Sequence, residues 1–573
     1  MPKGGEFILP SDKIPDILTV NNLTDEQRLI KETIAEVVDQ KLITDEAIRR
    51  IESKDFGFSR ELIRELAEVG FLGVEVPEEY GGTDLGAVVA AIVAEHVSKQ
   101  GSFACTFLAH TGIGTLPIRF FGTEEQKKKY LPKLVSGEWV AAYSLTEGVA
   151  GSDANSIRAT AVKSEDGKCL ILNGEKIFVT NGGFADLFII FAKVNGKDPT
   201  AFIVEKTFEG LRVGEEEHKM GIQGSSTATL ILDSVKVPVE NMLGEQGNGF
   251  KIAVNILNLG RFKLGAACLG AGRVCVDEAL QYSKERKQFG RQIGNFGVIR
   301  HKLAQMAALN YAMESVVYRT AGMLDEVIHG VDAKDSKAIL KAIEECAIEC
   351  SIVKVFCSEA LDFVVDENVQ VHGGSGFCEG HPERHYRDSR INRIFEGTNE
   401  INRLLLAGML FKKAMTGSLP VKDAIQKVIN ESMTPSIQTE PEDYVERLKI
   451  YLNNAKKAVL MAAGSAYEKF GLELEKHQVV LSSLADCLIK IYVLESVLAA
   501  FAKNRTEKES LLTGLIFNDN LFELERLTRE IVVMCSEGDT QRTQMSILRR
   551  LLKFSPGNKE NLSDKVTALL LGA

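Results

Sequence analysis

A glutamate at position 396 stands in a segment that could support proton transfer, RIFEGTNE (residues 393–400). Thr398 is placed to cap a helix that begins at Asn399, and Gly397 allows a tight turn before that helix. Glu396 would then lie just outside the helix start, beside the ring of Phe395. A carboxylate held there against an apolar ligand could act as a base. The alternative is a solvated carboxylate that stabilises the helix start.

Three other segments could hold a phosphate or a polar ring. The segment YSLTEGVAGSD (143–153) ends in residues that offer hydroxyls and free backbone N–H groups. Its alternative is an ordinary polar turn. The segment ERKQFGRQI (285–293) combines three cations with an aromatic ring, and its alternative is a set of cations near a helix C-terminus. The glycine-rich segment QVHGGSGF (370–377) leads towards Glu396.

Composition limits the classes of function. The 573 residues carry a net charge of −11, which argues against nucleic acid as a partner, although local arginines and N–H groups can still hold phosphates. Ten scattered cysteines without a CxxC pair predict free thiols and no metal site. The N-terminus lacks a secretory pattern, so we expect a cytoplasmic bacterial protein, or a mitochondrial one whose transit peptide has been removed. No membrane-spanning segment is expected, and Val479–Ala500 is interpreted as a buried helix.

The elements that must position these residues follow from hydrophobic periodicity. Helical spacing dominates the N-terminal part, where Thr24 and Gln27 form a capping-box pattern. Short apolar runs separated by glycine and asparagine then predict strands, and Asn173-Gly174 predicts a hairpin turn within 169–180. Helical spacing returns afterwards. We therefore predict a mostly α chain with a central β domain, divided at 1–139 (helical), 140–248 (β), 249–414 (helical, catalytic), 415–443 (linker with one short helix) and 444–573 (additional helical domain).

Taken together and in this order, these segments resemble the acyl-CoA dehydrogenase family over about residues 25–412. Further matching stretches are PEEYGG (77–82), EEQKKKYLP (124–132), KMG (219–221) and VP (237–238). Within the family the chain looks most like the very-long-chain branch, whose members carry an additional helical domain after the catalytic module. ILNLGRF (256–262) and NFG (295–297) also look like that branch.

The resemblance implies a bound FAD between the β domain and the second set of helices. It assigns one group of residues to the flavin and another to the pyrophosphate and adenosine, the second group acting across a subunit boundary. Phe178 stands where many relatives have Trp, and Gly148 replaces a frequent Pro. Glu400 stands where many relatives carry a neutral or acidic polar residue. The implied cofactor-binding residues are Tyr143, Leu145, Thr146, Gly151, Ser152, Phe178, Thr180, Arg286, Phe289, Gln370, Gly373, Gly374, Thr398 and Glu400.

The resemblance also implies the reaction. Glu396 removes the α-proton of a fatty acyl-CoA while the β-hydride passes to flavin N5, giving a trans-2-enoyl-CoA, the first step of β-oxidation. Arg261 and Gly397 orient the glutamate and its loop. Some branches place the base immediately before this arginine, but here that position is Gly260, which cannot serve. Gly297 stands where relatives with smaller substrates often have Gln, which fits a longer pocket.

Several alternatives stay open at this point. An acyl-CoA oxidase would pass electrons to oxygen, and a flavoprotein with an assembly or scaffold role would share the same segments. By resemblance the electron acceptor is an electron-transfer flavoprotein, and the additional domain suggests a homodimer. That domain also suggests peripheral contact with a membrane, although its amphipathic helices fit a protein core at least as well.

Overall fold

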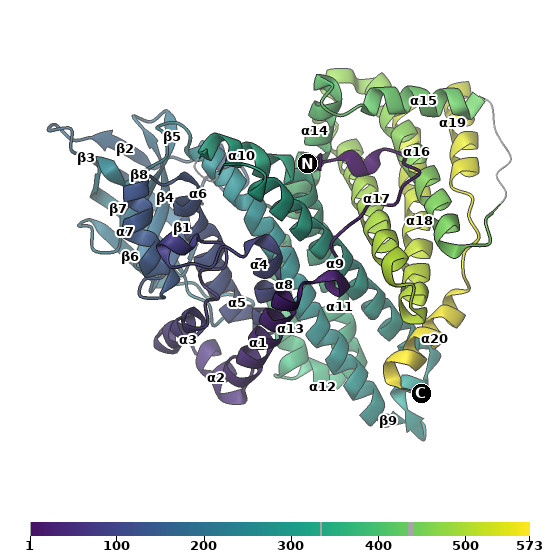
Figure 1. Cartoon of the computed structure of the whole chain (residues 1–573), viewed down its shortest axis with the longest axis horizontal. Coiled ribbons are helices and arrows are strands. Elements are labelled where there is room, and N and C mark those ends of the chain that lie inside the picture. The colour runs from purple at the N-terminus through teal and green to yellow at the C-terminus, as the bar shows by residue number, and fades with distance from the viewer. Residues whose placement is uncertain (1, 333–334, 434–439, 573) are drawn as a thin grey trace.

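The computed structural model describes residues 2–332, 335–433 and 440–572 and consists of a β domain flanked by helices, followed by a further helical bundle (Figure 1). This order confirms the predicted fold class. The helices that precede the sheet are α1 (Asp25–Lys41), α2 (Asp45–Glu52), α3 (Phe56–Glu68), α4 (Gly86–Val97), α5 (Gly101–Leu108), α6 (Leu116–Phe121) and α7 (Glu124–Val135). The predicted capping box of α1 is confirmed, because Thr24 and Gln27 bond to each other's backbone N–H groups.

The central sheet has the order β6-β7-β3-β2-β4-β5-β8, and β1 pairs in parallel with β4. Its central strands β4 and β5 are buried on both faces: Leu187 and Ile203 join the core of the helices, whereas Phe188, Phe202 and Val235 belong to a core of the sheet's own. Strand ends next to the helices carry the first group of predicted cofactor residues. The strands are β1 (Ala141–Ser144), β2 (Thr160–Lys163), β3 (Cys169–Thr180), β4 (Leu187–Val194), β5 (Asp198–Glu205), β6 (Leu211–Glu216), β7 (Thr227–Pro238) and β8 (Met242–Leu243).

The predicted hairpin turn at Asn173-Gly174 is wrong. Residues 169–180 form one continuous strand, β3, which pairs with β7 and contains a bulge between Leu172 and Gly174. Gly174 has φ +146°, and a Cβ at this position would lie 2.8 Å from the Cβ of Ala159. The same residue pair that suits a two-residue turn therefore serves a bulge and a close backbone approach, which a local pattern does not distinguish.

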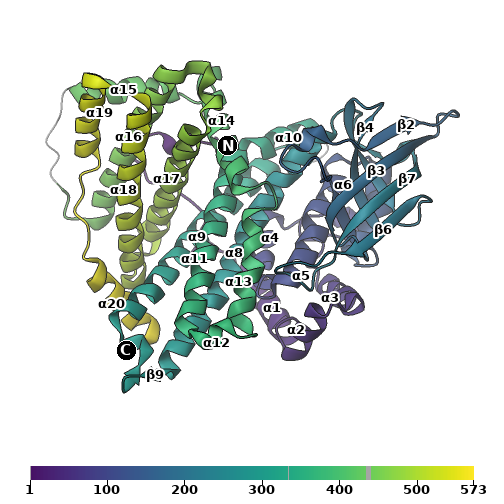
Figure 2. The same cartoon turned by 180° about the vertical axis from the view of Figure 1, so that it is seen from behind.

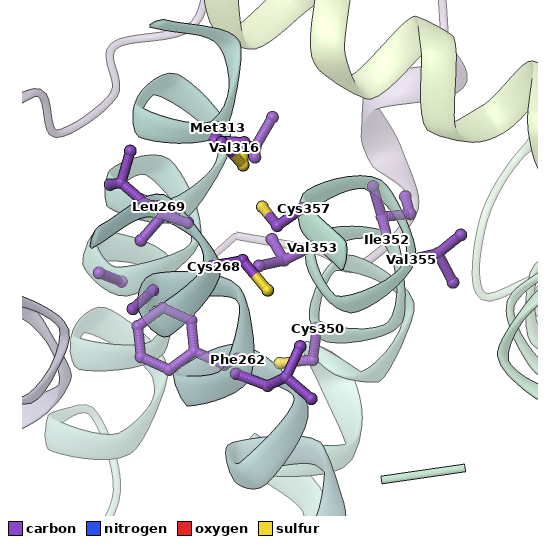
Figure 3. Close-up of a cluster of buried hydrophobic side chains, with 14 of the residues drawn as sticks. Phe262, Cys268, Leu269, Met313, Val316, Cys350, Ile352, Val353, Val355 and Cys357 are labelled. Atoms are coloured by element: carbon purple, nitrogen blue, oxygen red, sulfur yellow. The ribbon is translucent and has the colours of Figure 1, made fainter. Parts of the chain in front are cut away.

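Long helices form the second helical region and pack against one another along most of their length (Figure 2). Their contact surface is apolar: Cys268 of α8 lies beside Val353 and Cys357 of α11, with Met313 of α9 nearby (Figure 3). The elements are α8 (Gly249–Glu285), β9 (Lys287–Gln288), β10 (Arg291–Gln292), α9 (Gly297–His329), α10 (Ser336–Glu345), α11 (Ala347–His372), α12 (Gly374–Phe377), α13 (His381–Ser389) and α14 (Asn399–Thr416).

The C-terminal bundle packs beside α9, α11 and α14 (Figures 1 and 2). Its helices are α16 (Tyr444–Phe470), α17 (Gln478–Asn504), α18 (Glu507–Cys535), α19 (Gly538–Leu551) and α20 (Lys559–Leu571). One helix, α15 (Val421–Met433), lies in the predicted linker. The buried helix predicted at 479–500 is confirmed within α17. Among the described residues only α8 is long and apolar enough to cross a membrane, and 83% of its apolar window is buried inside the protein.

Candidate active site

Glu396 lies in a strained turn directly before α14. Its φ is +58°, in the left-handed region, and Gly397 follows with φ +80°. Thr398 caps the helix as the sequence predicts, because its Oγ1 accepts a hydrogen bond from Ile401 N at 3.3 Å. A non-glycine residue with such a φ persists only where neighbouring contacts fix it. The turn is therefore a position at which the surroundings determine where the carboxylate points.

Three buried polar side chains hold this turn, and a fourth, Asn258, holds one of them. Arg261 Nε donates to the carbonyl oxygen of Glu396 at 3.0 Å, and its NH1 group donates to Asn258 Oδ1 at 2.7 Å. The carbonyl oxygen of Gly397 accepts from Lys354 Nζ at 2.8 Å and from Asn402 Nδ2 at 2.8 Å. Arg261 thus contacts the backbone of the turn that it was predicted to orient.

Lys354 and Asn402 were not among the residues predicted from the sequence. A usable signal for Lys354 was its place as a single cation in the apolar run SIVKVF (351–356) of α11. Such a cation on a buried helix needs acceptors nearby. Lys354 finds them in the Gly397 carbonyl and in Asn399 Oδ1 at 2.5 Å. Burial lowers the pKa of Lys354 to about 8, although nearby Glu396 and other groups act in the opposite direction.

The Glu396 carboxylate has few partners. Its Oε2 atom is buried and has no hydrogen-bond partner in the described part of the chain. Burial raises the pKa of Glu396 to about 7, although Arg261 and Lys354 act in the opposite direction. A Cβ at Gly260 would lie 2.8 Å from Oε2, so the glycine makes the room that the carboxylate occupies. A buried carboxylate with a pKa near neutrality and a free oxygen can accept a proton from a ligand.

A cavity that is partly open to solvent reaches this carboxylate. One wall comes from α5 and α8, where small and aliphatic side chains face each other at helical spacing, and residues 385–396 form another. Along α8 the lining runs from Gly260 to Ala271, which are eleven positions apart, or about 16 Å along the helix. The apolar lining of the two helices consists of Gly101, Ala104, Leu108, Gly260, Leu264, Ala267 and Ala271. The shape suits a long hydrocarbon chain whose reactive end lies beside Glu396.

Gly297 does not contribute to this cavity. It is the first residue of α9, is exposed, and is absent from the cavity lining. The interpretation of Gly297 as space for a longer substrate is therefore wrong. Sequence position alone could not show that the start of α9 lies away from the α5–α8 wall.

The first group of predicted cofactor residues gathers beside the cavity. Tyr143 lies in strand β1, which ends at Ser144, and Leu145 and Thr146 continue from it. The carbonyl oxygens of Leu145 and Thr146 accept from Lys176 Nζ at 3.1 Å and from Ile177 N at 3.0 Å, which fixes this loop to β3. Thr180 at the end of β3 lines the cavity. The remaining members are exposed: Gly151, Ser152 and Phe178.

This region has the features of a ligand surface. Tyr143 Oη is buried without a hydrogen-bond partner among the described residues. Burial raises the pKa of Tyr143, and the nearby Glu396 raises it by a smaller amount. Phe178 is 61% exposed and has φ +57°. No atom lies within 4 Å of a Cβ built at Gly151. Unpaired polar groups, an open face at Gly151 and an exposed ring fit a flat polar cofactor such as a flavin.

The second group lies at the other end of the long helices. Arg286 follows α8, Phe289 sits in the turn between β9 and β10, and Gln370 and Gly373 end α11 before Gly374 begins α12. All five are exposed, and Phe289 is 92% exposed. Gly260 and Arg286 are 26 residues apart, or about 39 Å along the helix direction. One chain therefore does not bring the two groups together. Thr398 and Glu400 remain at the start of α14, where Glu400 is exposed.

One cluster of described residues could hold a metal ion by distance alone. Atoms of Cys275, Glu278 and His385 lie within 4.8 Å of one another. Glu278 Oε2 already accepts from Asn368 Nδ2 at 2.9 Å. Burial raises the pKa of Glu278, but contacts with His381 and His385 outweigh it and lower that pKa overall. The carboxylate thus has protein partners, and the absence of a metal site stays a prediction.

Comparisons with known proteins agree with this geometry. Profiles described as the N-terminal, middle and C-terminal domains of acyl-CoA dehydrogenase match residues 24–138, 142–235 and 247–411, and another C-terminal-domain profile matches 454–550. A probable acyl-CoA dehydrogenase of Bacillus subtilis (strain 168) is 44% identical over 97% of this chain and 95% of its own length. The chain belongs to the acyl-CoA dehydrogenase family.

Two further members of the family show how much of the chain is shared with known proteins. The human very long-chain specific acyl-CoA dehydrogenase is 45% identical over 60% of this chain and 52% of its own length, so this match spans about half of that protein. The solved structure of an acyl-CoA dehydrogenase complexed with FAD from Bacillus anthracis is 43% identical, with a TM-score of 0.97, over 100% of this chain and 99% of that one. The likeness to the B. anthracis protein includes the C-terminal bundle.

Proposed function

We propose that this protein is an FAD-dependent dehydrogenase that converts long-chain or very-long-chain fatty acyl-CoA into trans-2-enoyl-CoA, with Glu396 as the α-proton base. The observation that carries the proposal is the buried carboxylate of Glu396, with a pKa near 7 and one oxygen unpaired, at the end of an apolar cavity. Membership of the family supports the same reaction class.

The residues of this chain account for the proton. The α-C–H of a saturated acyl thioester is weakly acidic, so the base must be strong and close to it. An acyl chain that fills the cavity excludes water from Glu396 and raises its pKa further. The α-proton then goes to a Glu396 oxygen, and its electron pair forms the new Cα–Cβ double bond. The chemistry that FAD supplies when bound is acceptance of the hydride that leaves the β-carbon.

Arg261, Lys354 and Asn402 keep the base in place while it changes charge. All three donate to backbone carbonyls of the turn, and none forms a direct hydrogen bond with the carboxylate among the described contacts. The carboxylate therefore keeps its basicity, whereas an ion pair would lower it. Tyr143, Thr146 and Thr180 would hold FAD on the β-domain side of the same cavity.

The length of the α5–α8 wall supports a long acyl chain as substrate. Ala271 marks the far end of the lining along α8, so Ala271→Phe should shorten the cavity. We expect this variant to lose reduction by palmitoyl-CoA at least about tenfold while reduction by butyryl-CoA changes little. Equal losses with both thioesters would contradict the assignment of chain length to this wall.

We also propose a homodimer, in which Arg286, Phe289, Gln370, Gly373 and Gly374 of one chain complete the FAD site of the other. Their exposure and their distance along the helices from Glu396 support this arrangement. Arg286→Ala should then weaken FAD retention in both sites of the dimer, as the ratio of flavin to protein after gel filtration would report. By resemblance, the proposed electron acceptor is an electron-transfer flavoprotein.

An anaerobic absorbance titration with palmitoyl-CoA tests the reaction. The flavin band of the wild type should bleach, and Glu396→Gln should keep its colour. Glu165→Gln, the same change on an exposed turn residue, should behave as the wild type. Flavin that binds to both proteins and bleaches in neither, with short or long acyl-CoA, would refute the catalytic proposal and favour a scaffold role. Rapid reoxidation of the reduced wild type by air would indicate an oxidase.

A further inference from the structure

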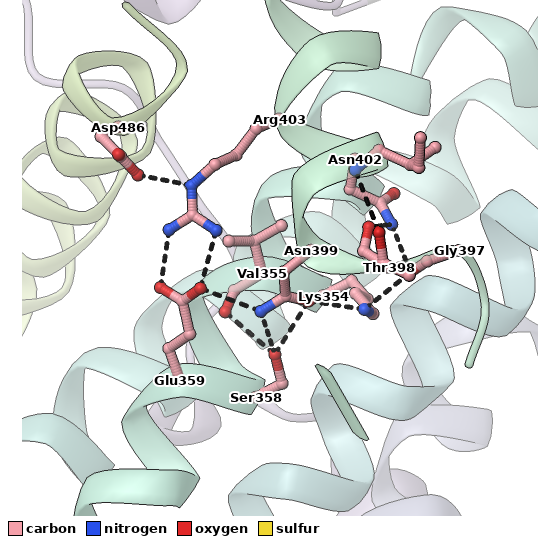
Figure 4. Close-up of polar contacts among 11 residues, drawn as sticks. Lys354, Val355, Ser358, Glu359, Gly397, Thr398, Asn399, Asn402, Arg403 and Asp486 are labelled. Carbon is pink, nitrogen blue, oxygen red and sulfur yellow. Dashed lines mark hydrogen bonds and ion pairs between the residues drawn. The ribbon is translucent and has the colours of Figure 1, made fainter. Parts of the chain in front are cut away.

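A chain of polar contacts connects the C-terminal bundle to the catalytic turn. It begins at Asp486 on α17, passes through Arg403 on α14 and Glu359 on α11, and reaches the turn through Asn399 and Lys354 (Figure 4). Three separate helices contribute, and α17 belongs to the domain that follows the catalytic module.

Arg403 is the centre of this chain. Its NH1 and NH2 groups donate to the two oxygens of Glu359 at 2.7 and 2.8 Å, and its Nε donates to Asp486 Oδ1 at 2.8 Å. The side chain is only 15% exposed. Burial opposes the positive charge, but hydrogen bonds and charges from Glu359 and Asp486 outweigh it, so the pKa of Arg403 is raised. A planar guanidinium paired in this way has little freedom to rotate.

The contacts continue from Glu359 to Gly397, the residue that follows Glu396. Glu359 Oε1 also accepts from Asn399 Nδ2 at 3.0 Å. Asn399 Oδ1 accepts from Lys354 Nζ at 2.5 Å, and the same ammonium donates to the Gly397 carbonyl at 2.8 Å. Asn399 and Lys354 are buried, and Asn399 also bonds to Ser358. Each link in this chain thus limits where the next side chain can lie.

These contacts matter because the turn that carries Glu396 is strained. The left-handed φ of Glu396 costs about 1 kcal/mol or more, and it persists because surrounding contacts enforce it. A displacement of about 1 Å in a catalytic group can lower a rate by about 100-fold. Small changes in the contacts that fix Gly397 should therefore affect catalysis more than they affect the fold.

We propose that Arg403 is a positioning residue and that the C-terminal bundle, through Asp486, helps to fix the catalytic turn of the same chain. The inference rests on the proposed role of Glu396. It gives the additional domain a part in catalysis that is separate from burying apolar surface.

A second ion pair provides a matched control. Glu495 lies on the same helix as Asp486 and pairs with Arg319 of α9 at 2.6 Å and with Lys456 of α16 at 2.5 Å. This pair also joins the bundle to the catalytic module, but its contacts lead to α9 and α16 and not to the turn. Glu495→Gln therefore reports what the loss of an interdomain ion pair does by itself.

The test uses stopped-flow reduction of the full-length holoenzyme by palmitoyl-CoA across pH 6–9, together with thermal unfolding. We expect Asp486→Asn to lower the limiting reduction rate about fivefold and Arg403→Met about twentyfold or more, with a shifted apparent pKa for the rate. Asp486→Glu should restore most of the rate. Glu495→Gln should lower the unfolding temperature but leave the rate and its pH profile unchanged.

The inference is overturned if Asp486→Asn and Arg403→Lys keep the wild-type rate and pH profile, whatever happens to the unfolding temperature. Arg403→Lys keeps the charge but not the bidentate geometry, so it remains informative if Arg403→Met does not fold. Failure of the proposed function has a different signature, because neither the wild type nor any variant would then be reduced.

Discussion

Two glutamates with desolvated carboxylates show how their surroundings assign opposite tasks to the same side chain. Glu396 lies at the end of the cavity with an unpaired oxygen, and burial raises its pKa to about 7. Glu495 is buried between α9, α16 and α17, where burial alone would also raise its pKa. Arg319 and Lys456 reverse that effect and lower it. The first arrangement leaves a carboxylate able to take a proton, and the second fixes a permanent charge that joins helices.

Glu396→Gln should have the largest effect on activity. Removal of a general base costs about 10²–10⁴-fold in rate. We expect about 10³-fold or more, because the other carboxylate that lines the cavity, Asp388, already accepts a hydrogen bond from Ile222 N. The unfolding temperature should fall little or rise, since a buried group with an unpaired oxygen is neutralised. The reduction rate measures the loss of activity, and thermal unfolding measures the change in stability. A large loss of stability would show that the carboxylate has partners of its own.

Glu495→Gln should show the reverse pattern. Two buried cations would lose the charge that pairs them, which typically destabilises a protein by about 3–5 kcal/mol. Chemical denaturation of the holoenzyme should detect this loss, while the reduction rate per folded enzyme stays at the wild-type value. The exposed pair of Arg526 and Glu530 supplies the reference, since Glu530→Gln should cost at most about 1 kcal/mol.

Gly260→Ala tests whether the space around the Glu396 carboxylate matters. The new Cβ would lie 2.8 Å from Oε2, so the carboxylate must move. We expect a loss of about 10- to 100-fold in reduction rate with normal flavin content. Ala253→Gly, a change on the same helix and equally buried, is a control for altered helix propensity. An unchanged rate in Gly260→Ala would mean that the position of the carboxylate tolerates displacement.

The pH dependence of the rate should follow Glu396. The base works only when ionised, so the second-order rate constant for reduction should rise as pH increases through about 7. Between pH 6 and pH 8 this rise is about tenfold for one group with a pKa of 7. Stopped-flow measurements in buffers of constant ionic strength would show it. A flat profile in this range would exclude Glu396 as the group that limits the rate.

The pH dependence of stability should differ in sign between the two glutamates. The raised pKa of Glu396 gives a stabilising contribution that is full below the unfolded value of about 4.5 and lost as pH rises through about 7. The lowered pKa of Glu495 gives a contribution that is present above about 4.5 and lost as pH falls through its folded pKa. Unfolding temperatures of the wild type and each Gln variant, compared between about pH 3 and pH 8, should separate in opposite directions.

Local signals in the sequence predicted much of this molecule. The capping residues Thr24 and Thr398 are confirmed, and so is the order of helices, strands and helices. Each depends on neighbours within a few residues. The roles of the cofactor-binding residues and the domain boundaries stay predictions. The hairpin at Asn173-Gly174 was wrong because turns and bulges use the same residue types.

The sequence by itself determined the family, the catalytic candidate Glu396 and the cap that places it before a helix. Tertiary structure decided the properties that depend on distance through space. Burial sets the pKa of Glu396, Lys354 and Asn402 fix its turn from other positions in the chain, and Gly297 lies away from the cavity. Desolvation and ion pairing depend on which groups the fold brings within a few ångströms, and residues far apart in sequence carry no local pattern for that.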